Sequence, residues 1–481
     1  MLDTVSDTKL KIKFFSFSVR CFVIFFTIIH CLLLMIMKDM CWCVWYGSSH
    51  ILYLPTKNYF RNESCLKKFV LEYITHSRMS FGLVGTGSMG SQLAINISKK
   101  HDIHVNNRSY SKVKQLSDAH PNIHGHESLV DFISNMETPR TIITMLPHGN
   151  PSTEMIQKLS RKLSPDDIII DCANELYRNS HFCHDFCEKR GIHYFGTGVS
   201  GGVLGALNGP ALMIGGSSEV YPRIKEFCES FSLNAVHISD DPGSGHFTKM
   251  VHNGVEYGML QGIADIFAYC NHDIDCFEHI LQEAKYTFAN GYLIDSALRV
   301  CKNVPVSRID GTCKMNDTGL WSQHYALQSH LMTPMLTAAL QARMYSEYTD
   351  PAQEISQTRH PVNHFYAKQA LLFTFASALL EGYAITTDKG LDIEKVKDAW
   401  SRGTIIESDM TTLDIEKLKS IRESTVEGAR NVCKTCMYSM IPVPTLANGI
   451  TAYDFERNGN KSTAFVMAQR NDFGDHAIEM K

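Results

Sequence analysis

The chain has 481 residues, a length that indicates two or three folded domains at roughly 150 residues each. Apolar residues make up 44% of it and charged residues 20%, which fits a globular protein and excludes a disordered or multispanning chain. The formal net charge of −4 provides no general positive field, so no nucleic-acid partner is expected and any anion must be bound locally.

The first 78 residues contain a strongly apolar stretch, 21–37, that follows several basic residues. At 17 residues it lies at the short end of the spanning range and resembles a membrane anchor or an uncleaved signal. The basic residues would send the rest of the chain across the membrane, which conflicts with the cytosolic chemistry that later segments indicate. We therefore expect 1–78 to be a misassigned upstream extension and Met79 to be the working start. Membrane contact is expected only if 21–37 is a real anchor.

A dinucleotide-binding motif follows directly. The short apolar run 81–84 leads into a G-x-G-x-x-G sequence and then into apolar residues at helical spacing, which is the strand, turn and helix that this motif requires. The first glycine permits a tight turn, the second lets the backbone approach a pyrophosphate, and the third allows the helix to pack closely on the strand. The helix N-terminus presents free N–H groups to the phosphates. The predicted cofactor residues here are Gly85, Thr86, Gly87, Ser88, Met89 and Gly90.

The second expected strand ends at 104–106 and leads into Asn107, Arg108 and Ser109. No carboxylate stands where an NAD-preferring site holds the ribose hydroxyls, and Arg108 offers a planar cation that suits a 2′-phosphate. The predicted cofactor is therefore NADP, with all three residues in contact with it. The alternative is that Arg108 is an ordinary surface residue.

Two further strands are predicted at 141–146 and 168–171, because buried apolar runs of this kind are typical of parallel sheets. Between about 245 and 440 the apolar pattern is helical, without a further alternation of strands. The predicted fold is an α/β Rossmann-type N-terminal domain followed by a large all-α domain and a short C-terminal tail. The expected boundaries are 79–244, 245–455 and 456–481.

The segment 196–216 is too rich in glycine for packing alone, which indicates that its backbone comes close to another group. One face of the next predicted helix carries polar residues at spacings of three and four, namely Lys249, His252, Asn253 and Glu256. An exposed polar stripe is the alternative to a site. Gly254 and Gly258 in this helix each cost about 1 kcal/mol relative to alanine, so we expect a ligand or a packed element against them.

Fifteen cysteines are scattered along the chain, without the dense spacing of a small disulfide-stapled domain, and we interpret them as reduced thiols. Cys433 and Cys436 form a lone C-x-x-C motif. A redox pair or half of a zinc site is the alternative, but no second pair accompanies them.

Two of these segments carry a resemblance. The loop Val199-Ser200-Gly201-Gly202 and the run from Gly245 to Gly258 strongly resemble 6-phosphogluconate dehydrogenase, of the 3-hydroxyacid dehydrogenase superfamily. The resemblance covers about 80% of the chain, from Met79 to the end. It implies oxidative decarboxylation of 6-phospho-D-gluconate to D-ribulose 5-phosphate and CO2, with reduction of NADP. This reaction belongs to the pentose phosphate pathway and gluconate utilization, and a cytoplasmic location follows from it.

The resemblance also implies roles for single residues. Lys249 is the base that takes the proton of the C3 hydroxyl while hydride leaves C3, and this requires a lysine pKa lowered toward neutrality. Loss of CO2 leaves an enediol, which Glu256 protonates at the C1 of the product. No metal is required. The expected substrate contacts are Asn174, Ser200, Gly201, Gly202, His252 and Asn253, and Asn174 also lies between cofactor and substrate.

The substrate phosphate is expected to bind Tyr257, Thr318, Arg343 and Arg470. By the resemblance, the last segment, including Arg470 and His476, reaches the site of the neighbouring subunit, so a homodimer with shared active sites is implied. The chain departs from the family at Asn316, where a phosphate-binding lysine is usual. Losing one charged contact costs about 1.5 to 3 kcal/mol if nothing replaces it.

Two other functions stay open. The first is a 3-hydroxyacid dehydrogenase that acts on an unphosphorylated acid, which Asn316 favours. The second is a catalytically weakened, NADP-binding paralogue that serves as a sensor or scaffold. A binding protein has no need of both Lys249 and Glu256, so their presence together argues against the second.

Overall fold

The computed structural model describes residues 79–315, 317–348, 359–459, 461–474 and 477. It also contains two short strands, β1 (Cys43–Tyr46) and β2 (His50–Tyr53), which pair antiparallel. By its internal contacts the chain divides into two units, Met1–Ser77 and Arg78–Lys481. The apolar stretch 21–37 lies outside the described residues, so its interpretation as an anchor stays a prediction.

The second unit begins with an eight-stranded sheet in the spatial order β10-β9-β8-β7-β6-β3-β4-β5. Neighbouring strands are parallel except β8 and β9, which pair antiparallel. The strands are β3 (Ser80–Val84), β4 (Ile103–Asn106), β5 (Ile123–His126), β6 (Arg140–Thr144), β7 (Ile168–Asp171), β8 (His193–Ser200), β9 (Ala211–Gly215) and β10 (Asn234–Ser239). The predicted strand 141–146 therefore ends at Thr144, because Met145 and Leu146 turn away to line a cavity.

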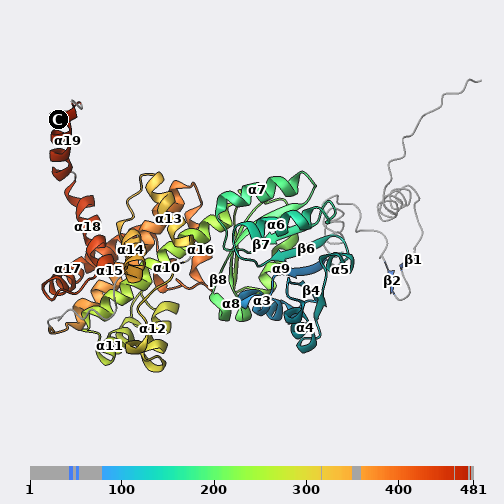
Figure 1. Ribbon diagram of the computed structural model, residues 1–481, viewed down its shortest axis with the longest axis horizontal. Coiled ribbons are helices and arrows are strands. Elements are labelled where there is room, and N and C mark those ends of the chain that lie inside the picture. The colour runs from blue at the N-terminus through green and yellow to red at the C-terminus, as the bar shows by residue number, and fades with distance from the viewer. Residues whose placement is uncertain are drawn as a thin grey trace, which may run out of the picture. The chain divides into compact units, whose positions relative to one another are not determined.

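Helices cover both faces of this sheet (Figure 1). They are α3 (Ser88–Ser98), α4 (Tyr110–Ala119), α5 (Leu129–Ser134), α6 (Asn150–Ser160), α7 (Tyr177–Glu188), α8 (Gly202–Asn208) and α9 (Pro222–Phe231). Adjacent residues of β3 enter different cores, Leu83 that of α3 and α9 and Val84 that of α6 and α7. Burial on both faces explains why the strands read as continuous apolar runs.

The rest of the unit is helical, which confirms the predicted fold class. Two short 3-10 turns, Val306–Arg308 and Asp409–Thr412, interrupt it. The helices are α10 (Ser244–Tyr269), α11 (Ile274–Ala284), α12 (Tyr292–Asn303), α13 (Asp317–Gln328), α14 (Pro334–Tyr348), α15 (His364–Asp388), α16 (Ile393–Ser401), α17 (Ile415–Tyr438), α18 (Pro444–Asn458) and α19 (Lys461–Gly474). The predicted domain boundary at 455 falls within α18, and the boundaries stay predictions.

Helix α10 joins the two halves of the unit and is buried on nearly all sides. Its first turns pack on β8 and β9, and its later turns pack on α13, α14 and α15. A Cβ at Gly198 on β8 would lie 2.3 Å from the Cβ of Lys249, and one at Gly245 would lie 2.2 Å from the Met213 carbonyl oxygen. The glycine-rich backbone therefore makes its close approach to α10.

The glycines inside α10 face packed elements, which decides between the two alternatives for them. A Cβ at Gly254 would lie 2.5 Å from Ser322 Oγ on α13, and one at Gly258 would lie 2.6 Å from Leu336 Cδ2 on α14. Glycine at these two positions thus lets α13 and α14 approach α10 more closely than a residue with a side chain would allow.

Among the described residues one helix, α15, is long and apolar enough to cross a membrane. Of its most apolar window, 72% is buried inside the protein, against helices that include α10 and α17. Burial of this kind is what the central helix of a folded core requires, so the finding is weak evidence for a membrane span.

The C-x-x-C cysteines lie on α17, one helical turn apart, and both are free and buried. Burial raises the pKa of the Cys436 thiol to about 12 and that of Cys433 above its usual value. Because the thiolate is the reactive form, neither residue is activated for redox chemistry.

Candidate active site

A cavity opens at the carboxyl ends of β3, β4 and β6. Six of its lining residues are among those predicted for the cofactor, and the full lining is Gly85, Thr86, Gly87, Asn107, Arg108, Ser109, Lys112, Met145, Leu146 and Pro147. Asn107 Oδ1 accepts a hydrogen bond from the Thr86 N–H at 3.2 Å, which ties the glycine turn to the loop after β4. Such a cavity at strand ends is where open parallel sheets bind ligands.

The three motif glycines have the geometry that their predicted roles need. Gly85 has a left-handed φ of 106°, and a Cβ on Gly90 would lie 2.0 Å from the Gly85 carbonyl oxygen. A Cβ on Gly87 would meet nothing within 4 Å. Only Gly87 thus leaves open space, on the side where a pyrophosphate has to approach the backbone.

Lys112 was missed by the sequence reasoning. It lies four residues after Arg108, is exposed on α4, and lines the same cavity. The signal for it was a second basic residue one turn into the helix that follows the Arg108 loop. Ser88, Met89, Gly90 and Asn174 do not line this cavity, and their contact with a cofactor stays a prediction.

The polar residues of α10 form one connected group with the last residue of β8 and with α13. Lys249 Nζ lies 3.2 Å from His252 Nδ1, and His252 Nε2 lies 3.1 Å from Ser200 Oγ. Asn253 Nδ2 donates to Thr318 Oγ1 on α13 at 2.9 Å, and its Oδ1 lies 3.1 Å from His252 Nδ1. Because these side chains are buried, the alternative of an exposed polar stripe is wrong.

Burial displaces the pKa values of the two proposed proton carriers in opposite directions. Desolvation lowers the pKa of Lys249 to about 8, against the attraction of Glu256. Desolvation raises the pKa of Glu256, against the positive charges of Lys249 and Arg343. A lysine pKa lowered toward neutrality and a carboxyl pKa raised toward it are the shifts that a base and an acid near neutral pH require.

His252 is held neutral, because burial and the neighbouring Lys249 lower its pKa well below the usual value. Its Nδ1 lies 3.8 Å from the Glu256 carboxylate, and this contact is not an ion pair while the ring is neutral. When Lys249 is protonated, Nδ1 must accept from Nζ, and Nε2–H then donates to Ser200. When Lys249 is neutral, Nδ1–H can donate instead, so the tautomer follows the charge of the lysine.

Arg343 and Tyr257 lie at the α14 side of this group. The Arg343 guanidinium stacks over the Tyr257 ring, 3.7 Å from its centroid, and Nη1 is 3.5 Å from the Lys314 carbonyl oxygen. Arg343 is near enough to Glu256 to lower the pKa of that carboxyl. A fixed guanidinium beside the acid residue suits an anionic end of a substrate.

Other predicted substrate residues differ in how far the structure brings them in. Gly201 and Gly202 begin α8 behind Ser200, whose Oγ accepts from the Ile405 N–H at 3.4 Å. Asn174 is partly buried in the loop after β7. Arg470 lies exposed on α19, where its Nη1 is 3.8 Å from the Met467 sulfur in the same helix. In Figure 1, α19 continues from α18 away from α10 and α13. His476 and Asn316 lie outside the described residues.

Two loop contacts escaped the sequence reasoning. The buried Glu175 accepts hydrogen bonds from the Gly149 N–H at 2.6 Å and the Leu176 N–H at 2.8 Å. It therefore joins the loops that follow β6 and β7. His148 lies 3.3 Å from Asp317 of α13, so the β6 loop also touches the helical half. A carboxylate in a loop gives no sign in the sequence of which N–H groups it will meet.

Comparison with known proteins assigns the family. A family model described as the NAD binding domain of 6-phosphogluconate dehydrogenase matches residues 80–239, and one for the 6-phosphogluconate dehydrogenase C-terminal domain matches residues 245–481. The chain belongs to the 6-phosphogluconate dehydrogenase family. Family membership confirms the resemblance seen in the sequence.

Relatives of the 6-phosphogluconate dehydrogenase family match nearly their whole length. The NADP(+)-dependent, decarboxylating enzyme of Bacillus subtilis is 28% identical over 458 residues, covering 84% of this chain and 97% of the relative. The NAD(+)-dependent enzyme of the same organism is 26% identical over 457 residues, covering 83% and 96%. Plasmodium falciparum 6-phosphogluconate dehydrogenase shares the fold, with a TM-score of 0.74 at 24% identity over 84% of this chain and 98% of that one. The N-terminal domain thus binds a nicotinamide dinucleotide, and the relatives differ in which one.

Proposed function

We propose that the chain oxidises and decarboxylates 6-phospho-D-gluconate to D-ribulose 5-phosphate and CO2, with NADP as the hydride acceptor. The observation that carries this proposal is the buried group on α10, where a lysine of lowered pKa and a carboxyl of raised pKa share one helix face. Family membership supports the substrate and the cytoplasmic, pentose phosphate setting.

The residues divide the reaction between them. NADP, when bound, accepts a hydride from the substrate carbon C3. Neutral Lys249 takes the proton of the C3 hydroxyl at the same time, and the hydroxyl oxygen becomes a ketone. The bond between the carboxylate carbon and C2 then breaks, its electron pair moves toward the ketone, and CO2 leaves. Glu256 gives its proton to the carbon that becomes C1 of the product, and Ser200, His252 and Asn253 hold the substrate oxygens.

The direct test is NADP reduction by the full-length protein, with CO2 release followed in parallel. Equal amounts of NADPH and CO2 from 6-phosphogluconate support the proposal. Turnover of 3-hydroxyisobutyrate without turnover of 6-phosphogluconate would instead establish the dehydrogenase of an unphosphorylated acid. Binding of NADP with no turnover of either acid would establish the binding paralogue.

Arg108 and Lys112 are proposed to select NADP over NAD through the 2′-phosphate. Replacing Arg108 by leucine is expected to raise the Kd for NADP roughly tenfold to a hundredfold, since a charged hydrogen bond contributes about 1.5 to 3 kcal/mol. The Kd for NAD should hardly change, because NAD has no phosphate there. Fluorescence titration with both dinucleotides measures the effect. Lys114→Leu is the matched control, because Lys114 lies on α4 close to Arg108 but pairs with Asp118 and is not part of the cavity lining.

Arg343 is proposed to bind the substrate phosphate. Arg343→Gln is expected to raise the KM for 6-phosphogluconate by roughly tenfold to a hundredfold, from the loss of a charge-assisted contact of about 1.5 to 3 kcal/mol. Steady-state kinetics check it, and kcat should fall much less than kcat/KM. Arg299→Gln is the matched control, because Arg299 also stacks over a tyrosine, Tyr292, but on α12. Equal KM values for the two variants would remove Arg343 from the phosphate site.

We propose a homodimer with shared active sites, because the family resemblance places Arg470 and His476, both in the C-terminal segment, in the site of the neighbouring subunit. Helix α19 leaves Phe465, Val466 and Phe473 exposed, which suits burial against a second copy of the chain. At a low concentration of 6-phosphogluconate, where Lys249→Met and Arg470→Ala chains are each nearly inactive alone, the two refolded together are expected to recover about one quarter of parental activity, because half of the dimers are mixed and hold one intact site. No recovery would place both residues in a site built within one chain.

A further inference from the structure

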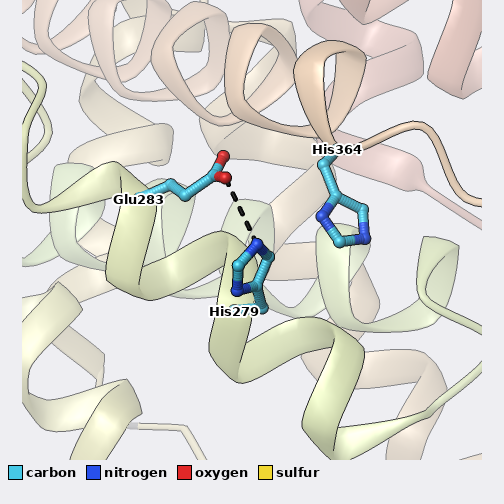
Figure 2. A group of neighbouring side chains, drawn as sticks. All are labelled: His279, Glu283 and His364. Carbon is cyan, nitrogen blue, oxygen red and sulfur yellow. Dashed lines mark ion pairs between the residues drawn. The ribbon is translucent and has the colours of Figure 1, made fainter.

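Three side chains of metal-binding type meet on the helical half, where α11 faces the start of α15. His279 and Glu283 are one turn apart on α11, and His364 is the first residue of α15. One ligand atom from each lies within 4.8 Å of those of the other two. Figure 2 shows the two imidazole rings and the carboxylate gathered around one space. We propose that these residues bind a divalent transition-metal ion, zinc foremost.

The donor set and its spacing suit zinc. Two imidazoles and one carboxylate are a common protein ligand set for this ion, with a fourth position for water. Metal–ligand bonds of about 2.0 to 2.2 Å place tetrahedral neighbours roughly 3.3 to 3.6 Å apart. His279 Nε2 and Glu283 Oε1 are 3.3 Å apart, so this pair already has the required separation. The ring of His364, centred 5.1 Å from that of His279, closes the remainder by a side-chain rotation.

A further contact orients His364. Figure 2 shows one ring nitrogen of His364 on the side of His279 and Glu283, and the other directed away. The Sγ of Cys276, one turn before His279 on α11, lies 3.6 Å from His364 Nε2. Metal-binding histidines usually have their second nitrogen held by a partner, which fixes the direction of the first. Cys276 is therefore assigned as a positioning residue of this site.

Lys368 is the group that opposes a cation here. It lies one turn after His364 on α15, and its Nζ is 2.6 Å from Glu283 Oε2. The lysine contacts Oε2 and His279 faces Oε1, which leaves one oxygen for the metal. The charge of Lys368 weakens the attraction for a cation, so its removal strengthens binding.

The test uses the full-length protein after dialysis against a chelator, titrated with Zn²⁺ by calorimetry and with Co²⁺ by visible absorption. The parent is expected to bind one equivalent at this site, which His279→Ala and His364→Ala lose. Lys368→Gln is expected to bind roughly tenfold more tightly, because a neighbouring positive charge is gone. Glu283→Gln is expected to bind more weakly. Zn²⁺ at a hundred times its Kd should also raise Tm, since a ligand of the native state stabilises by about 2.7 kcal/mol at that excess.

The second ligand-type group of the described residues provides the control. His184, Asp185 and Glu188 all lie on α7, and His184→Ala should keep the equivalent. His279 is half-exposed on α11, outside the α10 group, so a cooperative thermal transition close to that of the metal-free parent reports that His279→Ala is folded. Equal affinities in the Glu283 and Lys368 variants would overturn the proposal. So would an equivalent that survives in folded His279→Ala, or a parent that binds no Zn²⁺ at micromolar concentration.

Discussion

Lys249→Met is expected to lower the rate of hydride transfer to NADP on the order of 10³-fold, the usual contribution of a positioned general base. The lysine lies at the centre of the buried group, 3.2 Å from His252 Nδ1, and no other described side chain of that group is a base of suitable pKa. The Kd for NADP should stay near that of the parent, because Lys249 does not line the dinucleotide cavity. Rapid-mixing measurement of NADPH formation, with a separate NADP titration, checks both expectations.

The same variant should be more stable than the parent at neutral pH. Burial lowers the pKa of Lys249 from 10.5 to about 8, so the folded state holds the proton less tightly than the unfolded state. Burying the charged lysine reduces the free energy of unfolding of the parent. This reduction is complete below pH 8, where the lysine is charged in both states, and it disappears as pH rises through 10.5. The shift corresponds to roughly 3 kcal/mol. Chemical denaturation at pH 7 and pH 10 measures it.

Lys397→Met is the matched control for both measurements. Lys397 is as buried as Lys249, each being 8% exposed, but it lies on α16 and pairs with Glu394. Removing it should leave hydride transfer at the parental rate. If Lys249→Met turns over 6-phosphogluconate as fast as Lys397→Met does, Lys249 is not the base.

Glu256→Gln is expected to separate the two halves of the reaction. Release of ribulose 5-phosphate should fall by about 10² to 10⁴-fold, because the acid that protonates the enediol is gone. Hydride transfer should persist, and its pH dependence should move. In the parent its rate rises with pH through about 8, as Lys249 loses its proton. The charge of Glu256 raises the pKa of Lys249, so its removal shifts this rise to lower pH. Single-turnover NADPH formation across pH 6 to 10 measures the shift.

Glu381→Gln controls for a second group that titrates in the same range. Glu381 is buried on α15, and burial raises its pKa to about 8 as well. It accepts hydrogen bonds from the Met335 and Leu336 N–H groups and does not touch the α10 group. The rise near pH 8 should remain in this variant. If the rise near pH 8 shifts in Glu381→Gln and stays in place in Glu256→Gln, the titrating group is not Lys249.

The sequence predicted those parts of the fold and site that depend on local pattern. The geometry of the G-x-G-x-x-G turn can be predicted from the motif, because Gly85, Gly87 and Gly90 each meet a separate steric demand. The shared face of Lys249 and Glu256 follows from helical spacing alone. The large helical domain could be predicted because its apolar residues keep a helical period over many turns.

The remainder depended on contacts between distant segments. The direction in which β9 pairs with β8, which is antiparallel, cannot be predicted from its residues, because a buried apolar strand has the same composition in either direction. Lys112 and Glu175 act through loops whose meeting is set by the whole sheet. His364 lies 85 positions beyond His279, so their approach depends on the packing of α11 on α15.

The unbroken course of α10 has a consequence for engineering. Lys249 packs against β8 at one end of the buried group, and Glu256 lies about two turns further along α10, among residues that face α13 and α14. Any hinge movement between sheet and helices leaves the spacing of these two proton carriers unchanged, because one rigid rod holds both. A chimaera of two relatives that is joined at 240–243 inherits both carriers from a single parent. A junction within 250–255 would take them from different parents, and would set two independently evolved chemistries side by side.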